Sequence, residues 1–78
     1  MNQSILFNDD LTLDDKTSCW KMSAIVSGQI ISIYFHSLSL SRLEEIDQCT
    51  KYDLEEVAEL WLEDNELDGE EIHIMMKG

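Results

Sequence analysis

The sequence predicts a small α+β domain, in which an antiparallel sheet of about four strands packs on one main C-terminal amphipathic helix. Two periodicities lead to this prediction. Apolar residues recur at every second position in the first half of the chain, as in strands, and they recur at helical spacing over residues 54–62. The 78 residues are enough for one small core and leave no room for a second domain. We therefore expect residues 1–78 to form a single domain, with strands and a hairpin over 1–36, an acidic helical segment over 41–65 and a final strand over 71–76.

The expected strands follow from alternation and from one turn signal. Apolar residues alternate over 5–7 and again over 20–26. Ser27-Gly28 interrupts the second series, and residues 31–35 resume it, which predicts a β-hairpin that turns on a glycine able to adopt positive φ. Residues 11–13 are bracketed by turn-forming residues, so we expect an irregular connection there.

Two capping patterns predict where helices begin. Ser41 is followed three residues later by a glutamate, which predicts a short helical piece. Asp53 is likewise followed three residues later by a glutamate, Glu56. The apolar residues after Asp53 keep the i, i+3, i+4 spacing of a principal helix: Leu54, Val57, Ala58, Trp61 and Leu62. Asn65 and Gly69 are the expected stops, after which the final strand begins.

Charge is very unevenly distributed along the chain. There are 17 Asp and Glu against five Lys and Arg, a formal net charge of −12, and residues 44–71 hold 13 of the acidic residues with Lys51 as their one basic residue. Because DNA, RNA and anionic membranes are bound through cations, this composition excludes direct binding to them. No apolar run approaches the roughly 18 residues of a membrane span, and the N-terminus lacks the features of a signal peptide, so we expect a cytoplasmic protein.

Several segments stand in an order that is typical of a known family. They are Met1-Asn2-Gln3-Ser4-Ile5-Leu6-Phe7, Leu11-Thr12-Leu13-Asp14, the Gly28 turn with Ile30, Ile31 and Tyr34, Asp53-Leu54-Glu55-Glu56-Val57-Ala58-Glu59, and Leu67-Asp68 through Ile72 and Ile74. Together they resemble the bacterial domain of unknown function 1488, a family of small proteins. The resemblance implies an α+β fold with an antiparallel sheet and a C-terminal helix. It implies no activity and no site residues, because the family has none assigned.

The acidic side of the principal helix is the candidate partner-binding surface. Its charges lie outside the apolar stripe and at the end of the helix: Glu55, Glu56, Glu59, Glu63, Asp64 and Glu66. Carboxylates four residues apart are separated by about 6 Å along a helix axis, a spacing comparable with that of successive phosphates on a nucleic-acid strand. One hypothesis is therefore a non-catalytic binding protein that mimics nucleic acid and inhibits a basic DNA- or RNA-binding protein. The other is a solvated face that is acidic for solubility alone.

An alternative function of another class is a structural or assembly protein that self-associates as a homodimer. Its contact surface would be an apolar patch formed by Leu60, Met75 and Tyr34, and the acidity would serve solubility only.

Catalysis and cofactors have no support in the sequence. General acid–base chemistry needs a desolvated or paired carboxylate, and the carboxylates here occur in polar runs. No histidine is expected near Cys19 or Cys49, so both thiols are expected to be buried as small hydrophobes. Residues 64–69 resemble the first half of a calcium loop, but Glu71 and Met75 do not fit its second half. We expect no enzyme, no metal and no cofactor.

Overall fold

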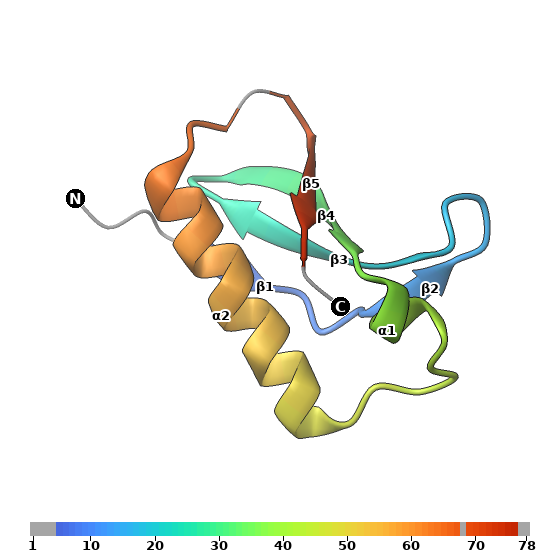
Figure 1. Ribbon diagram of the computed structural model, residues 1–78. Coiled ribbons are helices and arrows are strands. Elements are labelled where there is room, and N and C mark those ends of the chain that lie inside the picture. The colour runs from blue at the N-terminus through green and yellow to red at the C-terminus, as the bar shows by residue number, and fades with distance from the viewer. Residues whose placement is uncertain (1–4, 68, 77–78) are drawn as a thin grey trace.

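The computed structural model describes residues 5–67 and 69–76. Its elements follow in the order β1 (Ile5–Phe7), β2 (Thr12–Asp14), β3 (Cys19–Val26), β4 (Gln29–His36), α1 (Leu38–Ser41), α2 (Gln48–Asp64) and β5 (Glu71–Met75). α2 lies across one face of a five-stranded sheet (Figure 1). This is the α+β class that the sequence predicts. Residues 1–4 of the N-terminal family motif and Asp68 lie outside the described residues.

β3 and β4 form the hairpin that the alternation predicts. Their connection is Ser27 and Gly28, whose φ angles are 52° and 85°. Two positive φ angles in a two-residue loop are typical of a type I′ turn, whose twist matches that of the flanking strands. The turn sets the register of the whole hairpin, in which Trp20 lies opposite Phe35.

β1 and β2 lie end to end along the outer edge of β3. β1 pairs with the C-terminal end of β3 and β2 with its N-terminal end, both antiparallel. The chain leaves the edge at Asp9, whose φ is 52°, and the Asp10 carboxylate accepts hydrogen bonds from the backbone N–H and the hydroxyl of Ser23. The expectation of an irregular connection over 11–13 is therefore wrong. Residues 12–14 are a strand, because the Asp10 side chain replaces the ladder bonds that the interruption removes.

β5 lies on the other side of β4 and runs parallel to it, with Ile72 opposite Ile33. The sheet is therefore mixed, in the order β1-β3-β4-β5, and is not wholly antiparallel as the alternation suggested. The reason is the crossover through α2, which returns the chain to the end of the sheet where β4 began. The final strand covers residues 71–75 of the expected 71–76.

The short helix lies before Ser41, so its expected start is wrong. Ser41 is the last residue of α1, and Ser37 is its N-cap, with its Oγ accepting a hydrogen bond from the backbone N–H of Leu40 at 3.3 Å. Leu40 is buried, and its carbonyl accepts a hydrogen bond from the indole N–H of Trp20 at 2.7 Å. Burial of this leucine places the helical turn at 38–41, which the capping pattern alone does not show.

α2 begins at Gln48, five residues before the expected start at Asp53. Its N-cap is Asp47, whose carboxylate accepts a hydrogen bond from the backbone N–H of Thr50 at 2.8 Å. The helix ends at the expected place, because the backbone and side-chain N–H groups of Asn65 both donate to the Trp61 carbonyl oxygen.

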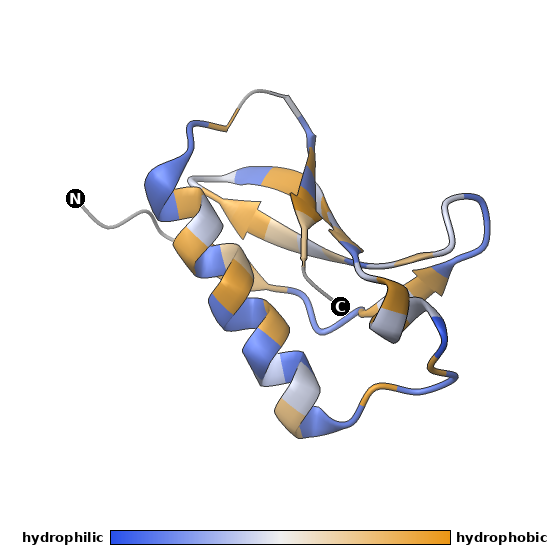
Figure 2. Ribbon diagram, viewed as in Figure 1, coloured by the Kyte–Doolittle hydropathy of each residue, from blue (hydrophilic) through white to orange (hydrophobic). Residues whose placement is uncertain are grey.

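The core lies between α2 and one face of the sheet. α2 buries Leu54, Ala58 and Leu62, with Val57 and Trp61 partly buried beside them. The sheet contributes alternate residues of three strands: Trp20, Met22, Ala24, Val26, Ile31, Ile33, Phe35, Ile72 and Ile74. Figure 2 shows the matching alternation of apolar and polar residues along α2. No helix of the described residues covers the opposite face of the sheet, which we call the open face.

The substitution Asp47→Ala should lower the Tm by about 4–8 °C, the shift that loss of one N-cap produces in a domain of this size. Hydrogen bonds from the side chain and backbone of Thr50 hold the pKa of Asp47 below its ordinary value of 3.8. The Asp47 carboxylate therefore stabilises the fold above about pH 4 and loses this effect as the pH falls through the lowered pKa.

Thermal melts of wild type and Asp47→Ala between pH 7 and pH 2 test this prediction. The difference in Tm should shrink below about pH 4, because both proteins then lack the charged cap. Asp47→Asn is the control, since its amide oxygen can still accept the Thr50 hydrogen bond. A difference in Tm that stays constant over the whole range would contradict the assignment.

Candidate functional site

Five of the six candidate carboxylates share the solvent side of α2. Glu55 is half-buried beside the apolar stripe, and the others are exposed: Glu56, Glu59, Glu63 and Asp64. The sixth, Glu66, follows the helix and lines a shallow hollow with Ser27 and Gln29 at the hairpin turn. The structure thus brings five of the candidates together on one surface, which we call the acidic face, and places Glu66 apart from it.

The acidic face has no counter-charge among the described residues. Glu55, Glu59 and Glu63 form a row at i, i+4 spacing, and within 5–67 and 69–76 no ion pair or hydrogen bond reaches their carboxylates. Lys51, the basic residue of α2, is ion-paired with Asp9. The negative potential of the row is therefore not neutralised within the described part of the chain.

Two large apolar side chains lie on the same side of α2. Tyr52 is 56% exposed and Leu60 is 53% exposed, and Glu56 lies between them, four residues from each. The Gln48 side-chain amide donates a hydrogen bond to the Tyr52 hydroxyl at 3.1 Å, which holds the phenol in place. Tyrosine is enriched at the centres of protein interfaces, whereas a face that serves only solubility gains nothing from exposed Tyr and Leu.

The apolar patch expected from Leu60, Met75 and Tyr34 does not form. Leu60 lies on the solvent side of α2, two residues from the buried Ala58. Tyr34 and Met75 alternate with core residues of β4 and β5, so they lie on the open face of the sheet, on the opposite side of the molecule. The prediction fails because it combined exposed apolar residues without knowing which face of the sheet α2 covers.

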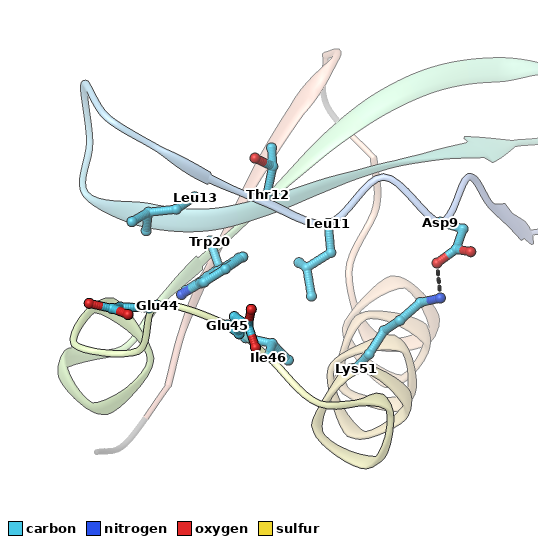
Figure 3. Close-up of a pocket in the computed structure, with 9 residues that line it drawn as sticks. All are labelled: Asp9, Leu11, Thr12, Leu13, Trp20, Glu44, Glu45, Ile46 and Lys51. Atoms are coloured by element: carbon cyan, nitrogen blue, oxygen red, sulfur yellow. Dashed lines mark hydrogen bonds and ion pairs between the residues drawn. The ribbon is translucent and has the colours of Figure 1, made fainter.

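A cavity of about 530 Å³ lies between β2, the 44–46 segment and the first turn of α2. Its apolar lining consists of Leu11, Leu13, Trp20 and Ile46. Figure 3 shows Glu44 at one end and the Asp9–Lys51 ion pair at the other, with Glu45 beside Ile46. An apolar lining with carboxylates at its edge suits the stem and charged head of a basic side chain.

The open face brings together three residues that the sequence analysis kept apart. Cys19 Sγ lies 3.3 Å from His36 Nδ1, and His36 Nε2 lies 2.8 Å from His73 Nδ1. The expectation that no histidine lies near Cys19 is wrong, and so is the expected burial of Cys49, which is exposed. Counting outward from the two-residue hairpin turn places residue 19 opposite residue 36, so the sequence held the signal for the first contact. The second contact depends on the parallel pairing of β5.

The described residues contain no group of three His, Cys, Asp or Glu that could hold a metal ion. None of the helices in the described ranges is long and apolar enough to cross a membrane.

Comparison with known proteins finds one kind of relative. No family model and no curated protein matches the chain. A solved structure does: a protein of unknown function from the DUF1488 family of Shewanella loihica PV-4, determined by crystallography at 1.60 Å resolution. It is 30% identical in sequence and superposes with a TM-score of 0.68, and the match covers 95% of this chain and 94% of that one.

Proposed function

We propose that this chain, which belongs to the DUF1488 family, acts by binding a basic macromolecular surface through the acidic face of α2. In its sharper form, the proposal is that the face mimics nucleic acid and occupies the cationic groove of a DNA- or RNA-binding protein. The observation that carries it is the row Glu55, Glu59 and Glu63, three carboxylates that no cation neutralises among the described residues.

Two further features favour a protein partner over a face that is only solvated. Like charges at i, i+4 destabilise the helix by about 0.2–0.5 kcal/mol per pair. Solubility needs negative charge on the surface but does not need the charges to lie in one row. Tyr52 and Leu60 add exposed apolar area within the charged surface, as the contact residues of interfaces do.

The cavity beneath β2 is a second candidate contact for the same partner, separate from the acidic face. A Lys or Arg side chain of the partner can lay its aliphatic stem on Leu11 and Ile46 and direct its charge toward Glu44 or Glu45. The proposed contact surface is therefore the acidic face, with this cavity as an additional pocket for a basic side chain.

The test is capture of partners from nuclease-treated lysate of the native cell, with elution along a salt gradient. Wild type should retain a nucleic-acid-binding protein that elutes at moderate salt, because exposed charge pairs are screened over about 8 Å at physiological ionic strength. The triple substitution Glu55→Lys, Glu59→Lys and Glu63→Lys should weaken this binding by at least about tenfold, since three attractions become repulsions and 1.4 kcal/mol corresponds to a factor of ten. Adding wild type should also release nucleic acid from the captured protein.

A charge-matched variant separates the acidic face from net charge. Asp15→Lys, Glu70→Lys and Glu71→Lys change the net charge equally at exposed positions outside both the row and the cavity lining. Circular dichroism should show both triple variants folded. The proposal predicts that the matched variant keeps most of the binding. Equal loss in both variants, or a partner that resists the salt gradient, would exclude the acidic face as the docking surface.

A further inference from the structure

The open face of the sheet carries a chemistry that the proposed function does not use. Cys19, His36 and His73 stand in one line across β3, β4 and β5, joined by contacts of 3.3 Å and 2.8 Å. We propose that Cys19 is a nucleophile that accepts an acyl group from a neutral ester or thioester, with His36 as its general base and His73 as the residue that positions His36. The arrangement of nucleophile, base and a third orienting group is the one that activates thiols and hydroxyls in acyl transfer.

One pair of histidine tautomers along the line allows a proton to pass from Cys19 to His36. With a proton on Nε2, His36 donates to His73 Nδ1 and leaves its own Nδ1 free to accept the proton of Cys19. Cys19 Sγ also lies 3.4 Å from the Thr17 carbonyl oxygen, which can accept the S–H while the thiol is at rest. When His36 Nδ1 takes the proton, the Nε2–H of His36 stays hydrogen-bonded to His73 Nδ1, so the His36 ring keeps its orientation.

His73 is itself held from two sides. Its ring stacks on Tyr34 with centroids 4.8 Å apart and an angle of 8° between the planes. Its Nε2 lies 3.9 Å from a carboxylate oxygen of Glu71. The stacking on Tyr34 fixes the plane of the His73 ring, so its Nδ1 stays directed toward His36 Nε2.

A cavity of about 430 Å³ borders the thiol. Its lining combines hydroxyl groups of Thr17, Ser18, Ser37 and Ser41 with the apolar side chains of Leu38, Met75 and Met76. Among the described residues the lining contains no Lys or Arg, and the chain as a whole carries a net charge of −12, so anionic substrates are disfavoured. The Thr17 and Ser41 hydroxyls already donate to Asp14 and to the Leu38 carbonyl oxygen. A neutral acyl compound suits the cavity, because the Ser18 hydroxyl can donate to a carbonyl oxygen and the apolar side chains can contact the acyl chain.

The proposed step balances without an added reagent. As Cys19 Sγ bonds to the acyl carbon, its proton passes to His36 Nδ1 and the carbonyl electrons move onto oxygen. The intermediate then expels the alcohol or thiol, which takes the proton back from His36 Nδ1. The products are an acyl thioester on Cys19 and the free leaving group. Water activated by the same nitrogen can release the acyl group as an acid.

A metal ion does not explain the line equally well. His36 turns one ring nitrogen toward Cys19 and the other toward His73, so the two neighbours lie at opposite ends of the ring. One ion between Cys19 and His36 would leave His73 out of reach, and the described residues contain no converging group of three ligands.

The experiment uses p-nitrophenyl acetate on the full chain, with acetylation of each cysteine followed by peptide mass spectrometry. Cys49 is the internal control, because it is an exposed free thiol of the same molecule. Cys19 is 7% exposed, so access alone would make it the slower of the two. We expect Cys19 to be acetylated at least about tenfold faster than Cys49. A positioned general base accelerates a reaction by about 10²-fold or more, which leaves a margin for the lower accessibility of Cys19.

Variants assign the roles of the two histidines, measured in a Cys49→Ser background. His36→Gln should slow acetylation of Cys19 by at least about tenfold. His73→Ala should slow it less, and His73→Gln should restore much of the rate, because an amide oxygen can accept the His36 hydrogen bond. Acetylation of Cys19 no faster than that of Cys49 in wild type would overturn the proposal, even if a histidine variant failed to fold. An unchanged rate in folded His36→Gln would overturn it as well.

Discussion

Replacement of Phe35 by alanine is expected to destabilise the fold by about 3–5 kcal/mol, as removal of a buried phenylalanine does in other cores. Phe35 is 0% exposed and lies in β4 between β3 and β5, where the sheet meets α2. A domain of this length has a stability of roughly 4–12 kcal/mol, at about 0.05–0.15 kcal/mol per residue, so the loss is a large share of the total. Urea unfolding followed by circular dichroism measures it.

Leu38→Ala is the matched control for this prediction. Leu38 is 75% exposed in α1, so its truncation should change the free energy of unfolding by no more than about 0.5 kcal/mol. The loss of unfolding free energy in Phe35→Leu should lie between those of Phe35→Ala and Leu38→Ala, because leucine keeps part of the buried volume. Equal unfolding midpoints for Phe35→Ala and Leu38→Ala would mean that the core does not depend on this ring.

The sequence predicts those parts of the fold that local signals determine. The hairpin follows from alternation on both sides of Ser27-Gly28, and the α2 stripe follows from the spacing of Leu54, Ala58 and Leu62. In both cases a short segment contains the whole signal. The α+β class then follows, because an apolar sheet face and an apolar helix stripe must cover one another.

The sequence fails where two local signals compete and a distant contact decides between them. Ser41 and Asp53 both carry a good capping pattern, yet Ser37 and Asp47 cap the helices instead. The hydrogen bond from the Trp20 indole to the carbonyl of Leu40 holds α1 in place, and no local pattern contains it. The direction of β5 is missed for a related reason, since alternation is the same in parallel and antiparallel strands.

The two candidate surfaces differ in the same way. The acidic face needed only helical spacing, because all five carboxylates belong to one helix. The line of Cys19, His36 and His73 needed strand pairing. The hairpin turn gives the first contact by counting, and the second required β5 to lie parallel beside β4. The spacing of residues along the chain does not show that side chains from three different strands lie together.

Replacement of Trp20 by alanine is expected to have a similarly large effect, about 3–5 kcal/mol. Trp20 is 6% exposed, lies opposite Leu13 of β2 and lines the cavity beneath that strand, so alanine would enlarge a cavity that is already present. Its indole also ties β3 to the carbonyl of Leu40. Two contributions, packing and hydrogen bonding, are therefore combined in the alanine variant.

Trp20→Phe separates them, because it keeps an aromatic ring in the core and removes the indole donor. The Leu40 carbonyl oxygen still accepts a hydrogen bond from the backbone N–H of Leu43 at 3.0 Å, so it is not left without a partner. Loss of this hydrogen bond should therefore lower the free energy of unfolding by only about 0.5–1.5 kcal/mol, well below the loss expected for the alanine variant. Urea unfolding of both variants, followed by circular dichroism, gives the comparison. If phenylalanine destabilised the protein as much as alanine, the indole bond to α1 rather than packing would hold the cavity wall, and the cavity would depend on α1 for its shape.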